Sequence, residues 1–190
     1  MRITLIRHLP TEWNRKTWLQ GRRDIGLAPL REEDRQRIAV NRRQLEKLAP
    51  FDAVLASMLT RTRQTARLYG YEADTESLLD ELDFGPFEGQ PKAALLEKYG
   101  SEWVETPKKL TLGESMQDFE KRIRTFLDKY RKQTNLLVFG HGSWIRAFLS
   151  YLDYGHINEM NKVTVENNCC LTRFFHLNHL KRRIEDCQKY

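Results

Sequence analysis

Cysteine is scarce in this chain, and no apolar run is long enough to cross a bilayer. The 190 residues include only three cysteines. This odd number shows no disulfide framework and favours a reducing compartment. No apolar run approaches the roughly 18 residues of a membrane span, so we expect no membrane partner. Because the first predicted strand begins at Arg2, with no room for a signal peptide before it, we expect a cytoplasmic protein.

Neither sign of charge is in strong excess. The chain has 32 Lys and Arg residues against 26 Asp and Glu residues, a net charge of +6. This surplus favours anionic partners but does not say which. The basic residues are scattered and form no stripe with aromatic residues, so we expect no nucleic-acid partner. With 40% hydrophobic residues, a chain of this length can bury one core, and we predict a single domain over residues 1–190.

Apolar runs alternate with helical patterns along most of the chain. This alternation predicts an α/β fold, a three-layer sandwich whose mostly parallel central sheet has helices on both faces. The predicted strands cover residues 2–6, 52–56, 73–77, 135–139 and 169–177, and the predicted helices cover residues 31–48, 58–69, 115–132 and 143–152.

Two segments interrupt the alternation. Residues 7–30 are irregular and contain several glycines and prolines, and a loop of this length in a compact domain is usually functional. Residues 78–113 contain seven glycines and prolines, with short helical pieces such as 91–98 between them. We interpret the second segment as a small helical cap inserted over the sheet. The polar tail, residues 178–190, is predicted to be peripheral.

Two histidines stand where buried strands are predicted to end. His8 follows the first apolar run, and His141 follows the apolar residues 136–139. Ligands of open α/β sheets bind outside the carboxyl ends of the strands, so we expect the two imidazoles to meet at one site. Arg7 adds a guanidinium beside His8, and this combination suits chemistry on an anion such as phosphate.

Six motifs follow one another along the chain, in residues 5–14, 18–21, 57–66, 81–89, 113–115 and 141–142. Together they resemble the histidine phosphatase superfamily, which includes the cofactor-dependent phosphoglycerate mutases. That family opens with Leu-x-Arg-His-Gly-Glu-Thr. The present chain departs from the pattern at Leu9 and Pro10, where the family usually has Gly and Glu, and at Gly140, where Ser or Thr is common. None of these changes removes a catalytic group.

The resemblance implies roles for the basic residues. His8 would be the nucleophile that forms a phosphohistidine. Arg7 and Arg61 would offer paired N–H groups to phosphate oxygens, and His141 would donate a further hydrogen bond, most effectively when protonated. The resemblance implies neither a metal nor another cofactor, because arginines and histidines neutralise the phosphate.

Glu81 is the general acid that the resemblance implies, and it would then act as the base toward water. Asp80 and Asp83 are rival carboxylates, whereas Glu88 is predicted to shape a loop or the substrate rim. The substrate-binding residues implied by the family pattern are Asn14, Gln20, Gly21, Gly142 and Ser143.

Two other patterns suggest different chemistry. Ser143 follows Gly-His-Gly, which is not the Gly-x-Ser-x-Gly turn of serine hydrolases. His176 and His179 have the spacing of metal ligands, but His176 belongs to a strand pattern and no set of Cys or carboxylate residues accompanies the pair. We therefore predict neither a serine nucleophile nor a metal site.

Three functions remain to be weighed. The leading one is a metal-independent phosphomonoesterase of the histidine acid phosphatase type, acting on a small phosphorylated metabolite through a phosphohistidine. The alternative is a cofactor-dependent phosphoglycerate mutase, which is less favoured because dedicated mutases tend to have a longer insertion before the second histidine. A non-catalytic anion-binding or regulatory protein is disfavoured by the complete set of catalytic residue types. The substrate and the oligomeric state stay open; residues 9–30 and 84–113 are expected to form the pocket rim.

Overall fold

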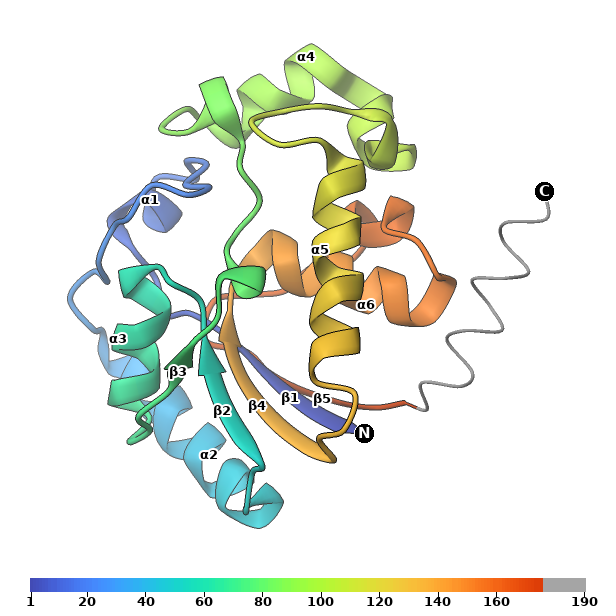
Figure 1. The fold of residues 1–190 in the computed structure, drawn as a ribbon. Coiled ribbons are helices and arrows are strands. Elements are labelled where there is room, and N and C mark those ends of the chain that lie inside the picture. The colour runs from blue at the N-terminus through green and yellow to red at the C-terminus, as the bar shows by residue number, and fades with distance from the viewer. Residues whose placement is uncertain (176–190) are drawn as a thin grey trace.

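A computed structural model of the protein describes residues 1–175 and contains a five-stranded sheet (Figure 1). The strand order is β3-β2-β4-β1-β5, and only the pairing of β5 with β1 is antiparallel. This mostly parallel sheet confirms the predicted α/β fold. The strands are β1 (Arg2–Arg7), β2 (Ala53–Ala56), β3 (Asp74–Thr75), β4 (Asn135–Gly140) and β5 (Cys170–Phe174).

Helices cover both faces of the sheet, as predicted. Strand β4 is buried along its whole length, as expected for a central strand of a parallel sheet. Its alternate residues point to opposite faces: Leu136 and Val138 pack with α5 and α6, whereas Leu137 and Phe139 pack with α2 and α3. The helices are α2 (Glu32–Leu48), α3 (Thr60–Leu68), α5 (Met116–Lys129) and α6 (Gly142–Tyr154).

The register of β1 against β4 positions the two histidines. Arg7 pairs with Gly140, the last residue of β4. The backbone N–H of His8 then donates to the Gly140 carbonyl at 2.9 Å. Strands β1 and β4 both end at the carboxyl edge of the sheet, so His8 and His141 lie beside each other as expected.

The predicted cap consists of short elements above the carboxyl ends of the strands (Figure 1). Its buried side chains, which include Phe84, Leu95 and Trp103, join the same apolar cluster as α5 and α6. The cap is therefore packed on the sheet domain through a continuous core. Its elements are the 3-10 turns η1 (Ser77–Leu79), η2 (Gly85–Phe87) and η3 (Pro107–Lys109) and the helix α4 (Lys92–Glu105), which packs against the later turn η4 (Asn158–Lys162).

Some predicted boundaries were wrong. The segment 7–30 contains a short helix, α1 (Glu12–Arg15), because the Thr11 side chain accepts from the Asn14 N–H and closes a capping box. Helix α4 continues beyond residue 98, since Gly100 adopts a positive φ of 48° between two helical pieces. Strand β3 has two residues instead of five because η1 begins directly after it.

Some of the predictions concern residues that the structure does not describe. Residues 176 and 177 of the last predicted strand, His179 and the tail 178–190 lie outside the described residues. Within residues 1–175, no helix combines the length and the apolar character needed to cross a membrane.

Candidate active site

A cavity of about 360 Å³ opens at the carboxyl ends of β1 and β4. All of the residues predicted to bind substrate line it, and so do four of the five predicted catalytic residues. The exception is His141, which lies behind the cavity wall. The predicted residues that line the cavity are Arg7, His8, Asn14, Gln20, Gly21, Arg61, Glu81, Gly142 and Ser143.

The His8 ring is buried and held in one orientation. Its Nδ1 lies 2.7 Å from the Leu9 carbonyl oxygen, which can only accept a hydrogen bond. Nδ1 therefore carries the hydrogen, and Nε2 has a free lone pair. Burial, followed by the charges of Arg61 and Arg7, lowers the pKa of His8 well below its usual value. The imidazole is thus neutral at pH 7, the form that a nitrogen nucleophile requires.

Arg7 packs against the first residue of α6. Its Nη1 donates to the Val165 carbonyl at 2.6 Å, while its Nη2 donates to no residue in the described part of the chain. A Cβ at position 142 would lie 3.1 Å from the Cζ and Nε atoms of Arg7, so Gly142 permits this close approach. Burial lowers the pKa of Arg7, and the charge of Glu81 opposes that shift. Arg7 thus brings a poorly solvated positive charge to the cavity.

Arg61 binds the backbone of the loop that contains Gly21 and Arg23. Its Nη1 donates to the Arg23 carbonyl and its Nη2 to the Gly21 carbonyl, both at 2.8 Å. Its Nε donates to Nδ1 of His141 at 3.2 Å. Burial lowers the pKa of Arg61 to about 10. Each Nη retains a second N–H, so the guanidinium can hold the loop and still face an anion.

His141 lies close to His8 but does not face the cavity. The two ring centroids are 5.3 Å apart. Because Arg61 donates to Nδ1, the hydrogen of His141 is on Nε2, which donates to Ser57 Oγ at 2.6 Å. Burial and the neighbouring Arg61 lower the pKa of His141 well below its usual value. The structure therefore differs from the expectation of a protonated donor, since His141 is neutral and orients Arg61.

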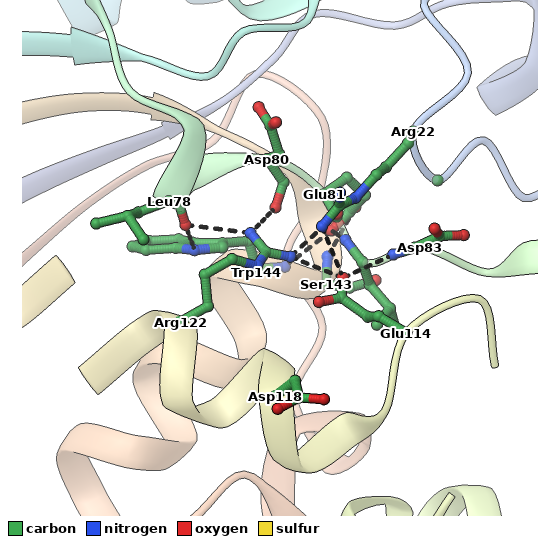
Figure 2. Close-up of polar contacts among 12 residues, drawn as sticks. Arg22, Leu78, Asp80, Glu81, Asp83, Glu114, Asp118, Arg122, Ser143 and Trp144 are labelled. Atoms are coloured by element: carbon green, nitrogen blue, oxygen red, sulfur yellow. Dashed lines mark hydrogen bonds and ion pairs between the residues drawn. The ribbon is translucent and has the colours of Figure 1, made fainter. Parts of the chain in front are cut away.

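Glu81 is the carboxylate that reaches the cavity. Its Oε2 accepts from the Ser143 N–H and its Oε1 accepts from the Trp144 N–H, each at 3.0 Å (Figure 2). The Oε1 atom also accepts from the Leu82 N–H at 3.0 Å. Two of these donors belong to the first turn of α6, so this turn holds both oxygens of the Glu81 side chain in place. The rivals Asp80 and Asp83 bind backbone N–H groups elsewhere and do not line the cavity.

Glu88 shapes the loop that carries Gln20 and Gly21. Its Oε1 accepts from the Arg22 N–H at 2.8 Å. Gly21 has a φ of +52°, and a Cβ there would fall 1.9 Å from that oxygen. Only glycine fits both the backbone conformation and the close approach. The loop-shaping role expected of Glu88 agrees with this geometry.

Sequence reasoning missed two basic residues of the cavity, Lys92 and Arg146. Neither forms an ion pair with a carboxylate among residues 1–175. Burial lowers the pKa of Arg146 to about 10 and also lowers the pKa of Lys92. Arg146 follows Gly142 by four residues on α6, and this helical spacing is a signal that could have found it.

The described part of the chain contains no group of three or more His, Cys, Asp or Glu side chains placed to hold a metal ion. His176 and His179, whose spacing resembles that of metal ligands, lie outside that part.

Comparison with known proteins identifies the class to which this fold and site belong. A family model described as the histidine phosphatase superfamily (branch 1) matches residues 3–186, and the chain belongs to this superfamily. It is 31% identical over 181 residues to 2,3-bisphosphoglycerate-dependent phosphoglycerate mutase 2 of Gloeobacter violaceus, covering 86% of this chain and 81% of that protein.

Two further relatives carry phosphatase names. Phosphoserine phosphatase 1 of Hydrogenobacter thermophilus is 30% identical over 159 residues, covering 77% of this chain and 74% of that protein. The crystal structure of the alpha-ribazole phosphatase from Shigella flexneri superposes with a TM-score of 0.70 at 26% identity, covering 90% of this chain and 89% of that one. The chain is thus similar to both phosphatases and mutases.

Proposed function

We propose that this protein is a phosphomonoesterase that transfers the phosphoryl group of a small metabolite to His8 and then to water. The observation that carries the proposal is the orientation of His8. Its Nδ1–H is held by the Leu9 carbonyl, and its neutral ring shares a cavity with Arg7, Arg61 and Glu81. Membership of a superfamily of phosphatases and mutases supports the same reaction class.

The reaction has two steps. His8 Nε2 attacks phosphorus as the ester P–O bond breaks, and the departing oxygen takes a proton from the protonated carboxyl of Glu81. Water then attacks phosphorus while the P–N bond breaks, and Glu81 accepts the proton that water loses. Inorganic phosphate leaves, and both residues return to their starting forms.

Preorganised positive charge stabilises the transferring group. Phosphoryl transfer spreads negative charge over three equatorial oxygens, and fixed donors are most effective where that charge develops. Arg7 and Arg61 supply two buried guanidinium groups at the cavity. Arg61 is braced by His141, so its orientation needs no rearrangement when substrate binds.

The substrate in this proposal bears a second anionic group. Arg7, Arg61, Lys92 and Arg146 line the cavity with a single carboxylate, Glu81. With Glu81 protonated for the first step, a bound phosphate dianion leaves two of the four positive charges unmatched, and burying unpaired charge is costly. A carboxylate or a second phosphate near Lys92 and Arg146 would offset it. Phosphoserine and phosphoglycerate both have such a group.

The same cations keep the phosphoglycerate mutase as a second candidate. Lys92 and Arg146 would suit the carboxylate of phosphoglycerate, and a mutase relative covers most of the chain. The two candidates differ in the fate of the phosphoryl group, because a mutase returns it to a bound intermediate. Faster isomerisation of 3-phosphoglycerate than release of inorganic phosphate would favour the mutase.

The first test measures phosphate release from p-nitrophenyl phosphate in the presence of EDTA. We expect turnover without added metal and a loss of at least roughly 10³-fold in the His8→Ala variant, because removing a covalent nucleophile blocks the pathway. Acid-labile phosphate should be trapped on wild-type protein by rapid quenching but not on the variant. Undiminished activity of His8→Ala would overturn the mechanism.

The second test compares matched substrates. Phosphoserine differs from phosphoethanolamine by one carboxylate, so their ratio of kcat/KM isolates the second anion. We expect wild-type protein to prefer phosphoserine roughly 10-fold or more, as for one charged hydrogen-bond partner. Lys92→Met and Arg146→Met should reduce that ratio and leave p-nitrophenyl phosphate turnover within about threefold. Equal kcat/KM of wild-type protein for the two substrates would exclude a preference for a substrate with a second anionic group.

A further inference from the structure

The segment that carries Glu81 has no regular secondary structure. Residues 80–84 belong to no helix or strand, so their backbone carbonyls need donors from elsewhere. Arg122, on α5, supplies them to this segment and its approach. Its Nη1 donates to the carbonyls of Leu78 at 3.2 Å and Asp80 at 2.6 Å, and its Nη2 donates to the carbonyl of Glu81 at 3.3 Å (Figure 2).

Glu114 holds the other side of the same segment. Its Oε1 accepts from Arg122 Nη2 at 2.8 Å and from the Asp83 N–H at 3.0 Å (Figure 2). The same oxygen is 3.4 Å from Nη2 of Arg22, next to the loop that lines the cavity. One ion pair therefore binds the backbone before, at and after Glu81.

This ion pair is sheltered from solvent. The side chains of Arg122 and Glu114 are only 12% and 14% exposed, respectively. The guanidinium also lies 4.9 Å from the centre of the Phe119 ring. Low exposure and several directed hydrogen bonds restrict the Arg122 side chain more than a surface ion pair would. The backbone that it binds is restricted in turn.

Helix α6 fixes the carboxylate while α5 fixes its backbone. The Trp144 N–H donates to Glu81 Oε1, and the Trp144 indole N–H donates to the same Leu78 carbonyl that Arg122 binds (Figure 2). Neither Arg122 nor Glu114 lines the cavity. Both residues contact the segment that carries Glu81, and Glu114 also contacts Arg22 beside the cavity loop.

We propose that Arg122 and Glu114 are positioning residues that place the Glu81 carboxyl within reach of the leaving-group oxygen. The proposal rests on the function proposed above, in which Glu81 donates the proton. A misplacement of about 1 Å can cost about 100-fold in rate. Loosening the segment should therefore impair proton donation while the nucleophile and the cations stay in place.

The test uses the leaving group. Nitrophenolate departs with little need for a proton, whereas the more basic phenolate depends on a general acid. Phenyl phosphate and p-nitrophenyl phosphate differ by one nitro group, and kcat/KM covers the steps up to departure of the alcohol. Glu81→Gln sets the reference: we expect a loss of roughly 100-fold on phenyl phosphate and of less than roughly threefold on p-nitrophenyl phosphate.

Arg122→Lys and Glu114→Gln should reproduce this selectivity with smaller losses, roughly 10- to 100-fold on phenyl phosphate. Lysine keeps the charge but lacks the planar fork that reaches several carbonyls. The matched control is Arg124→Lys, a change at an exposed residue two positions further along α5. It should leave kcat/KM unchanged on both substrates. Thermal unfolding checks that each variant is folded, and Glu114→Gln tests the proposal if Arg122→Lys does not fold.

Equal losses on both substrates, or no loss, in the Arg122 and Glu114 variants would overturn the positioning role. If Glu81→Gln loses more kcat/KM on phenyl phosphate than on p-nitrophenyl phosphate and the Arg122 and Glu114 variants do not, only the positioning role fails. If Glu81→Gln itself treats both substrates alike, the proton-donor assignment fails and the positioning role with it. If the Glu81, Arg122 and Glu114 variants all lose kcat/KM on phenyl phosphate but not on p-nitrophenyl phosphate, the proton-donor role of Glu81 and the positioning role are both supported.

Discussion

Acidification from pH 7.5 to pH 5.5 should destabilise the protein through its two buried histidines. His8 and His141 both have pKa values well below the usual value, with burial as the main cause. In the unfolded chain both would titrate near pH 6.5. The unfolded state therefore binds more protons as the pH falls below that value, and folding stability decreases. Above pH 6.5 both rings are neutral in either state, so the stability is fully present there.

The size of the effect follows from linkage. For a group with a pKa of about 6.5 in the unfolded state that stays neutral in the folded state, this change in pH costs about 1.4 kcal/mol. The two histidines together cost about 2.7 kcal/mol, a large part of the 5–15 kcal/mol typical of a domain. Carboxylates contribute little in this window, because in the unfolded chain they titrate near pH 4.

Urea unfolding followed by tryptophan fluorescence measures this loss. The free energy of unfolding is extrapolated to zero urea at both pH values. The variants His8→Asn and His141→Asn should each remove about half of the pH-dependent loss, whatever their own stability at pH 7.5. A wild-type loss below about 0.5 kcal/mol, or the same loss in the double variant, would refute the argument that buried neutral histidines cause it.

Three further substitutions test the packing of the site. Gly142→Ala places a Cβ 3.1 Å from the Arg7 guanidinium, so kcat/KM should fall roughly 10-fold, as for one weakened charged hydrogen bond, with little change in melting temperature; an unchanged kcat/KM would contradict the role of Arg7. Gly21→Ala collides with Glu88 Oε1 and adopts a strained positive φ, so urea unfolding should show a loss of about 1–3 kcal/mol; a stabilised variant would exclude the collision. Phe126→Ala opens a cavity in the buried apolar cluster that packs against α6, and urea unfolding should show a loss of about 3–5 kcal/mol. At temperatures where this variant is fully folded, its kcat/KM should match that of wild-type protein.

Local patterns predicted the regular elements well. Helix α5 has buried residues at helical spacing and a Ser115 side chain that accepts from the Asp118 N–H, both of which are readable from the sequence. The sequence predicted a helical piece over residues 91–98, and Gly100 was one of several glycines and prolines in that segment. In the structure, Leu95 and Trp103 are buried on either side of that residue, and this packing supports helical turns on both sides of it.

The site was only partly predictable. The meeting of His8 and His141 followed from the end of two strands at one sheet edge. Arg146 was missed although its helical spacing from Gly142 points to the cavity. The Arg122–Glu114 pair was missed because nothing in a single sequence distinguishes its residues from those of a solvated helix face. The neutral state of His141 was missed because it depends on burial in the folded protein and on Arg61, a residue 80 positions away.

The sequence alone determined the alternating strands and helices, the family to which the chain belongs and the types of side chain brought to the sheet edge. Hydrophobic periodicity and ordered motifs are local properties, so they can be read without a structure. Only the tertiary structure decided which of three neighbouring carboxylates faces the cavity, which nitrogen of His8 is free and how many cations line the cavity. Those properties depend on burial and on hydrogen bonds between residues far apart in the chain.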